Sequence, residues 1–278
     1  MNFLRLIGSR PRSVIEPLGD GAVLHTYRRH LHESLRMGPN EVHAIIIHAD
    51  GSVTDLGVSH NLLTNIGKDV FANMQGGAIP AGGAGSPLTA VGATSATATG
   101  TPWTASNLAT PQLGLVGLRI YVPVTGITTA PVYGNIVSNT TSVATIDQWW
   151  TAADGVGTTP ASTNAFILGA GGPASIRFMA LTTDAAAASA ADTVLATEIT
   201  TNGGGRALAT YAHTYGTGTY TLQKTFTITG TLTAIHKMGL YPHLGASTGP
   251  VVFESVLNAD ATVVNGDSLQ VTDTVTLS

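Results

Sequence analysis

The most recognisable catalytic pattern in this chain is a Gly-x-Ser-x-Gly sequence at residues 245–249. In hydrolases this pattern holds a nucleophilic serine on a sharp turn between a strand and a helix, and an acid and a histidine follow later in the chain. Here Pro250 comes next, the apolar run at 251–257 predicts a strand, and no histidine lies beyond His243. We therefore interpret residues 245–249 as a glycine-rich hairpin loop and predict no catalytic residue there.

The nine histidines are the second group that could do chemistry, because imidazole binds metals and transfers protons. On a helix His30 and His32 would point roughly 200° apart, and on a strand His43 and His48 would lie on opposite faces because their separation is odd. A third set of histidines could come together only through the tertiary fold: His25, His32 and His60. The chain has no cysteine, which excludes disulfides and thiolate metal sites. We predict no metal site and no cofactor.

Glycine runs and arginines raise the question of phosphate or nucleic-acid binding. Gly169–Gly172 and Gly203–Gly205 do not have the spacing of a phosphate-binding loop, and Gly-x-x-x-x-Gly-Lys is absent. The N-terminal arginines are interleaved with acidic residues, so residues 1–69 carry seven basic and seven acidic side chains. This pattern suits an arm that docks on another subunit. The arginines concerned are Arg5, Arg10, Arg12, Arg28, Arg29 and Arg36.

Three further features have an ordinary structural interpretation. The adjacent Trp149 and Trp150 form a possible carbohydrate platform, although such a pair is more often core packing. Asn139-Thr140-Thr141 matches a glycosylation site by chance. A polysaccharide-degrading enzyme would need paired carboxylates in a cleft, and the acids of the second half are scattered singly: Asp147, Asp154, Asp184, Asp192, Glu198 and Glu254.

Composition narrows the class of protein. The chain has 278 residues, 28.4 kDa, a net charge of −4 and a mean hydropathy of +0.24. Charged residues make up 10%, against about a quarter in an ordinary soluble protein. The negative charge disfavours a nucleic-acid partner. There is no apolar run of membrane-spanning length and no signal-peptide pattern, so we expect no membrane partner and synthesis in the cytoplasm. A surface with few charges is typical of a protein in an assembly.

Helical signals are confined to the first quarter of the chain. A stripe of apolar residues at helical spacing predicts a first helix that ends before Gly38-Pro39: Leu24, Tyr27, Leu31 and Leu35. A second stripe predicts a helix from Asn61 to Gly76: Leu63, Ile66, Val70 and Met74. Between them Asp50-Gly51 predicts a hairpin turn flanked by two strands.

The middle of the chain lacks charge, since no charged residue occurs from Val70 to Leu118. Its glycines exclude a helix in water. We predict a long loop at 78–100 and a small β module at 101–150, because flexible linkers do not usually contain the apolar side chains found there.

The C-terminal third predicts antiparallel strands with one buried face, because apolar residues alternate with threonines at 219–233 and 268–277. Lys224 and Asp273 interrupt the two apolar faces, and they would pair if these strands were neighbours. Further strands are predicted at 190–200, 206–214, 234–241 and 251–257. The fold class is mainly β: an antiparallel, jelly-roll-like β-sandwich with a short helical N-terminal region and an inserted small β module.

Several segments, in order along the chain, resemble virion structural proteins of tailed bacteriophages. Residues 54–68 are similar to the Asn-Leu-hydrophobic-Thr-Asn-x-Gly opening of that family. Further blocks are similar to its later segments: Met179–Thr182, Asp192-Thr193, Thr197–Ile199, Ile235–Tyr241 and Gly266–Leu277. The block Val132–Thr140, followed by Ile146–Trp149, resembles a small β module inserted in some members. The resemblance implies a β-rich, oligomeric particle protein without an active site.

We expect a non-enzymatic virion structural protein that forms a homo-oligomer, with a trimer as the first choice, and contacts other virion proteins. The first expectation is a minor tail protein; a capsid decoration protein on the head is the alternative, and a receptor- or carbohydrate-binding module is a further one. That module would expose Trp103, Tyr133, Trp149 and Trp150. The expected domains are a docking arm at 1–40, a sandwich from 41–77 and 173–278, and an insertion at 78–172.

Overall fold

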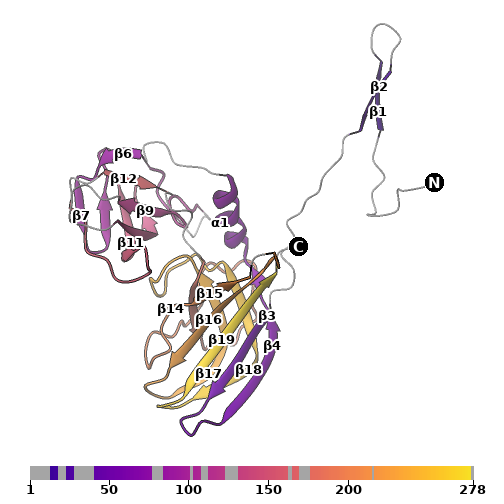
Figure 1. The fold of residues 1–278 in the computed structure, drawn as a ribbon, viewed down its shortest axis with the longest axis vertical. Helices are drawn as coiled ribbons and strands as arrows, with labels where there is room; N and C mark the ends of the chain where they lie inside the picture. The colour runs from indigo at the N-terminus through magenta and orange to yellow at the C-terminus, as the bar shows by residue number, and fades with distance from the viewer. Residues whose placement is uncertain are drawn as a thin grey trace.

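The protein is mainly β. The computed structural model describes residues 13–17, 23–27, 41–76, 84–100, 103–107, 112–122, 131–161, 165–168, 176–214 and 216–276. These residues form antiparallel sheets and a single helix (Figure 1). The predicted fold class, antiparallel and sandwich-like, is confirmed.

The body consists of two five-stranded antiparallel sheets. The first, here called the threonine sheet, has the order β15-β16-β19-β3-β4. Its strands are β3 (Glu41–Ile47), β4 (Val53–His60), β15 (Thr210–His213), β16 (Thr219–Thr227) and β19 (Ser268–Thr276). The second, here called the strap sheet, has the order β14-β13-β17-β18-β5. Its strands are β5 (Leu62–Leu63), β13 (Phe178–Thr182), β14 (Ala207–Leu208), β17 (Leu232–Tyr241) and β18 (Phe253–Val263).

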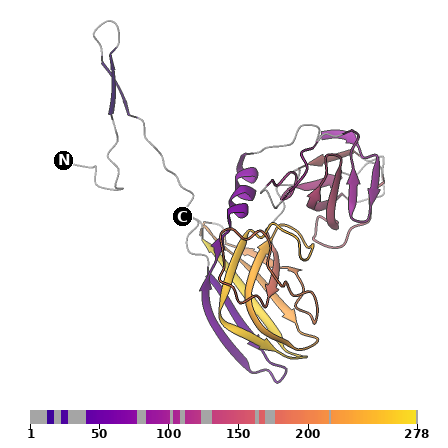
Figure 2. The ribbon, with the colours of Figure 1, turned by 180° about the vertical axis from the view of Figure 1, so that it is seen from behind.

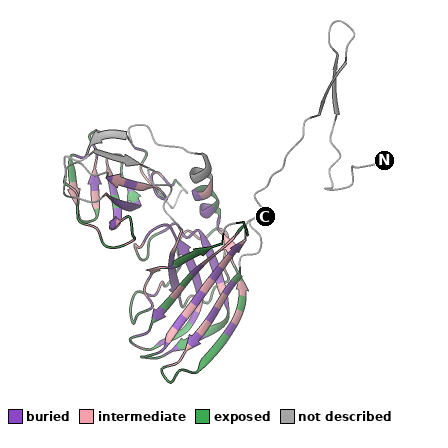
Figure 3. Cartoon of the chain, in the orientation of Figure 1, coloured by how far each residue is buried: buried purple, intermediate pink, exposed green. Residues whose placement is uncertain are grey.

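Alternation along the strands forms the core between these sheets (Figure 3). In β19, Leu269, Val271, Asp273 and Val275 are fully buried, and the residues that alternate with them are only partly buried. Their neighbours across the core come from the strap sheet, among them Met238 and Leu240. A strand places alternate side chains on opposite faces, so the threonines are left on the outer face.

The predicted hairpin at Asp50-Gly51 joins β3 to β4. Gly51 has φ +84, a left-handed conformation that glycine adopts without a steric penalty. Asp50 accepts hydrogen bonds from the backbone N–H and the hydroxyl of Ser52, 2.9 and 2.7 Å long, which closes the turn.

The second predicted helix is α1 (Asn65–Gly76), and it begins four residues later than predicted because Leu63 belongs to β5. Thr64 caps it, since its hydroxyl accepts the Gly67 N–H at 2.9 Å. The same hydroxyl donates to the Val251 carbonyl at 2.6 Å, which fixes α1 to the strap sheet. Within the described part of the chain, no helix is long and apolar enough to cross a membrane.

The inserted module is a seven-stranded sheet with its own core, ordered β6-β12-β9-β10-β11-β8-β7. Its strands are β6 (Ala84–Pro87), β7 (Ala90–Gly92), β8 (Ser95–Thr97), β9 (Arg119–Val122), β10 (Val132–Asn139), β11 (Val143–Thr151) and β12 (Ala165–Leu168). In both views it lies beside the end of the sandwich that carries α1 (Figures 1 and 2). The prediction of a long loop at 78–100 is wrong for its described part, because β6, β7 and β8 occur there. Small side chains such as Ala96, fully buried, allow these short strands to pack.

The predicted first helix is also wrong where the structure describes it. Leu24 and Tyr27 lie in β2 (Val23–Tyr27), which pairs with β1 (Ser13–Pro17) in a two-stranded sheet. Val23, Thr26 and Tyr27 are β-branched or aromatic and favour a strand. Leu31 and Leu35 lie outside the described residues.

Three strand predictions need correction. Residues 190–200 form no strand; they belong to a segment that crosses the strap sheet. The segment 206–214 is split at Ala209 between β14 and β15, which belong to different sheets. The strand predicted at 219–233 ends at Thr227, and the next begins at Leu232, so a turn separates them.

The predicted Lys224–Asp273 pair does not form, although β16 and β19 are neighbours. In the register Leu222 lies opposite Asp273, and Lys224 lies opposite Val271. The Lys224 side chain extends away from Asp273, because its Nζ lies 6.0 Å from the centre of the Phe226 ring, and Phe226 is farther along β16 from Asp273 than Lys224 is. Asp273 is hydrogen-bonded to another residue, as described below.

Candidate functional site

A set of buried charges lies where residues 183–206, here called the strap, pack on the strap sheet. Strand β13 shows how the strap is placed: Met179 and Leu181 belong to the central core, whereas Phe178 and Ala180 pack on the opposite face with Leu195 of the strap. The strap is also held by backbone hydrogen bonds, from Ile199 N to Leu181 O at 2.8 Å and from Val251 N to Thr193 O at 2.9 Å. It therefore closes the outer face of the strap sheet.

One charged group under the strap is the pair Arg206–Glu198. Both side chains are 0% exposed, and two parallel hydrogen bonds of 2.9 and 2.7 Å join them. The guanidinium carbon lies 3.4 Å from the centre of the Tyr241 ring, and Ser247 N donates to the second Glu198 oxygen at 2.7 Å. A buried pair of this kind is stable only when its remaining donors and acceptors are also satisfied.

His243 completes this group and is neutral. Burial, followed by the charge of Arg206, lowers its pKa to about 3. Its Nε2 lies 2.7 Å from the Gly249 carbonyl and its Nδ1 lies 3.3 Å from the Arg206 guanidinium. The carbonyl can only accept and the guanidinium can only donate, so the proton is on Nε2. An imidazole with this pKa is a poor base at neutral pH.

The second charged group is centred on Lys237, whose Nζ lies 2.8 Å from both Asp184 and Glu254. Burial opposes the charge on Lys237, but the hydrogen bonds to the two carboxylates outweigh it and raise the lysine pKa. Burial also raises the pKa of Glu254, with a contribution from its hydrogen bond with Asp192, against the opposing effect of Lys237. Lys237 and Glu254 are each 1% exposed as side chains.

These charges satisfy one another, and all except Asp184, which is 24% exposed, are closed off from solvent, so the arrangement is one that fixes the strap. Residues 245–249, the Gly-x-Ser-x-Gly sequence, form a turn between β17 and β18. They lack the preceding strand and following helix of a nucleophile elbow. Ser247 has φ +56 and uses its N–H to bind Glu198. Sequence reasoning missed both charged groups, because their members meet only where the strap packs on the strap sheet.

The predicted histidine positions do not converge on a metal site. His43 binds Asp55 at 2.8 Å, and His48 binds Thr54 at 3.0 Å. Over the described parts of the chain, no group of three or more His, Asp or Glu side chains could hold a metal ion. His25 lies in β2, and His30 and His32 lie outside those parts, as do the six N-terminal arginines.

The glycine run Gly203–Gly205 has a packing role. A Cβ on Gly203 would lie 1.9 Å from the Thr227 carbonyl oxygen, and its φ is +80. Only glycine fits there. The turn that contains Gly203 lies at the C-terminal end of the strap and packs against Thr227. Gly169–Gly172 lies outside the described residues.

The four aromatic residues proposed as a carbohydrate platform are all buried, with exposures of 8% or less: Trp103, Tyr133, Trp149 and Trp150. Trp149 and Tyr133 are also bound through their polar atoms, to Gly92 O at 3.0 Å and Asp154 at 2.7 Å. Asn139 of the glycosylation pattern is 5% exposed, and its amide donates to two backbone carbonyls. None of these residues presents an exposed binding surface.

Polar contacts fix the inserted module to the body. Asp147 of β11 accepts hydrogen bonds from Trp150 Nε1 at 3.0 Å within the module and from Leu244 N at 2.9 Å in the body. Arg177 of the body lies 2.6 Å from Asp154 of the module. The Arg177 hydrogen bond lowers the pKa of Asp154 against the effect of burial. The scattered acids of the sequence therefore have structural partners.

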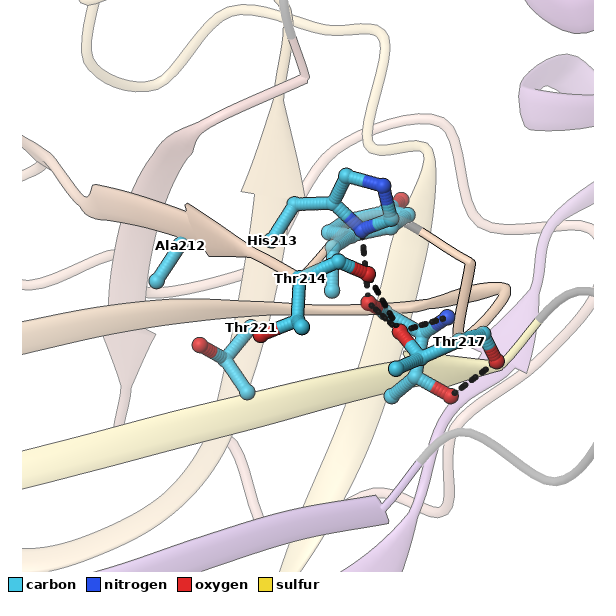
Figure 4. A pocket seen from close by; sticks show the side chains of 7 residues that line it. Ala212, His213, Thr214, Thr217 and Thr221 are labelled. Atoms are coloured by element: carbon cyan, nitrogen blue, oxygen red, sulfur yellow. Dashed lines mark hydrogen bonds between the residues drawn. The ribbon is translucent and has the colours of Figure 1, made fainter.

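A surface pocket lies between β15 and β16 (Figure 4). Its polar contacts are local: His213 Nδ1 binds the Thr219 carbonyl at 2.8 Å, and the Thr217 hydroxyl donates to Thr214 O at 2.7 Å. Threonines dominate the lining, which contains no acid, lysine or arginine: Ala212, His213, Thr214, Thr217, Thr219, Tyr220 and Thr221.

Comparisons with known proteins add no identification: no family model, curated protein or solved structure matches this chain. The likeness to phage virion proteins rests on the sequence segments. In the structure these segments form β4, β5 and the start of α1, strands β13, β17 and β19, part of the strap, and strands β10 and β11 of the inserted module.

Proposed function

We propose that this chain is a non-enzymatic structural protein of a tailed-phage virion, that it assembles as a homo-oligomer, with a trimer as the first choice, and that it belongs to the tail. The ordered sequence segments support the virion assignment. The closed charged groups under the strap support a structural role, because a hydrolase would need such groups in an open cleft.

The observation that carries the assembly proposal is strand β15 at the edge of the threonine sheet. All four of its residues, Thr210 to His213, are exposed, and none is lysine, proline or an acid. Tyr211 is 48% exposed. Natural edge strands usually carry charges or proline that prevent pairing with another chain. An edge without them favours pairing with a second copy.

The outer face of the threonine sheet supports the same proposal. Its two central columns lie in register, with Thr219 opposite Thr276 and Thr221 opposite Thr274. Glutamines join the columns: Gln223 donates to Thr272 at 3.0 Å, and Gln270 donates to a neighbouring threonine at 3.1 Å. These two columns contain no charged side chain. A flat polar face of this kind adds little charge repulsion when copies approach.

A capsid decoration protein on the head is the second candidate, favoured by the low charge content of 10%. The receptor- or carbohydrate-binding alternative loses its support, because the aromatic residues that it required are buried.

Light scattering coupled to size-exclusion chromatography tests the assembly. We expect the mass of a homo-oligomer for the wild type and a smaller species for Ala212→Lys, which places a charge on the edge strand. Thr233→Lys is the matched control, since it adds the same charge to an exposed position on β17 of the strap sheet, away from β15 and from the outer face of the threonine sheet. A wild-type monomer at every concentration would refute assembly. An Ala212→Lys variant with the wild-type mass would refute the edge contact.

A further inference from the structure

A carboxyl group is buried in the core of the sandwich without a compensating cation. Asp273 lies on the inward face of β19, between Val271 and Val275, and it is 0% exposed. In the register it faces Leu222 of β16 on one side and Val42 of β3 on the other. Placing an ionised carboxylate in such apolar surroundings is very unfavourable.

The partner of Asp273 is the amide of Asn61, in the connection between β4 and β5. Asn61 Nδ2 donates to Asp273 Oδ1 at 2.7 Å. The other two oxygens, Asp273 Oδ2 and Asn61 Oδ1, are both buried and have no hydrogen-bond partner. Two unsatisfied buried acceptors on one pair of side chains are costly, and they share a remedy, because one proton would turn one of them into a donor.

The neighbouring elements supply no positive charge to Asp273. On β16, Lys224 extends toward Phe226, and Tyr220 is a neutral phenol whose pKa burial and the Asp273 carboxyl raise to about 12. On β4 and β18 the hydroxyls of Ser59 and Ser255 bind each other at 3.1 Å and carry no charge. Glu41 of β3 and His60 of β4 are exposed and lie opposite each other in the strand register, at positions that alternate with the inward-facing Val42.

We propose that Asp273 and Asn61 form a buried proton-binding site: a proton on Asp273 Oδ2 donates to Asn61 Oδ1 and closes a ring of two hydrogen bonds between acid and amide. A protonated carboxyl can donate in this way. The ring satisfies all four heteroatoms and removes the buried charge. The raised pKa of Asp273, about 7 as a result of burial, agrees with this geometry.

The site joins distant parts of the chain. Asn61 begins the segment that leads to Thr64, the cap of α1, and Asp273 lies on the last strand. When the proton leaves, the bond from Oδ2 is lost, two oxygens face each other, and a charge remains in the core. The connection between β19 and the start of α1 therefore weakens as the pH rises toward and through neutrality.

Carboxyl-carbon NMR on the full chain tests the site directly. We expect one side-chain carboxyl that titrates at about pH 7, instead of about pH 4 as for an ordinary aspartate, and its absence in Asp273→Asn. A spectrum in which every aspartate titrates near the ordinary value would overturn the proposal, and this wild-type measurement needs no variant to fold.

Denaturation of Asp273→Asn provides the second test, because asparagine carries a permanent N–H donor for Asn61 without charge. We expect its urea midpoint to exceed that of the wild type above about pH 7, and the difference to shrink toward about pH 4. Asp69→Asn is the control, since Asp69 is an exposed carboxyl on α1. A loss of stability in Asp273→Asn at every pH would overturn the proposal, because the ionised form would then be the one required.

Discussion

Glu198→Gln should destabilise the fold strongly, although the substitution keeps the shape of the side chain. Arg206 would remain 0% exposed with its positive charge, but without a carboxylate. For charges about 4 Å apart in surroundings with an effective dielectric constant of about 20, the lost attraction is about 4 kcal/mol. This agrees with the cost of about 3–5 kcal/mol for breaking a buried pair by removing one partner.

The chain offers a matched control in Asp154→Asn. The Arg177–Asp154 pair is similarly short, at 2.6 Å, but its side chains are 20% and 33% exposed. Water screens such a pair, so we expect a loss of about 1 kcal/mol or less. Replacing Glu198 and Arg206 together by leucine and methionine should recover much of the loss, because no unpaired charge is then left in the interior.

Urea unfolding followed by far-ultraviolet circular dichroism measures all four proteins. The reasoning predicts that Glu198→Gln is the least stable, that Asp154→Asn is close to the wild type, and that the double variant lies between them. If Glu198→Gln cost no more than Asp154→Asn, the claim that a buried ion pair fixes the strap would be refuted. A double variant less stable than Glu198→Gln would refute the assignment of the cost to the unpaired charge.

Three further outcomes are expected. Gly203→Ala should destabilise the protein by at least about 2 kcal/mol more than Gly216→Ala, measured by urea unfolding; both glycines have positive φ, but only at Gly203 would the Cβ collide, with the Thr227 carbonyl. Equal losses would contradict the packing role of that turn. His243 has a folded pKa of about 3, below the ordinary histidine value of 6.5, so its contribution to stability is complete above about pH 6.5 and is lost as the pH falls toward 3. His243→Gln should flatten this slope, which is at most about 1.4 kcal/mol per pH unit, and an unchanged slope would argue against it. Removal of residues 1–40 should leave a soluble β body that no longer binds the particle in a co-sedimentation assay, whereas full occupancy by the shortened protein would rule out a docking arm.

Local signals in the sequence predicted the elements that depend on local physics. The alternation of apolar residues and threonine identified β16 and β19, the Asp50-Gly51 pair identified the hairpin, and the stripe ending at Gly76 identified α1. In each case the residues that determine the element lie next to one another in the chain. The fold class followed from these elements.

The buried polar groups depend on register and could not be predicted in the same way. Lys224 and Asp273 lie on neighbouring strands and on the same face, as expected, but a two-residue offset separates them, and Asn61 binds the carboxyl instead. Residues 190–200 of the strap were predicted as a strand because Leu195 and Ile199 are apolar. In the structure both side chains are buried in the apolar clusters of the body, but the segment that carries them is irregular. Other polar contacts of the strap, such as Asp184 with Lys237, join residues that are far apart in the chain.

Gold-labelled antibody against this protein, applied to intact particles of the tailed phage proposed to carry it and viewed by electron microscopy, tests the central claim most directly. We predict label on the particle at the tail; label over the head would move the protein to the capsid and keep its structural role. Particles without any label, in preparations where a known virion protein is labelled, would contradict the proposal that this chain is an exposed component of the virion.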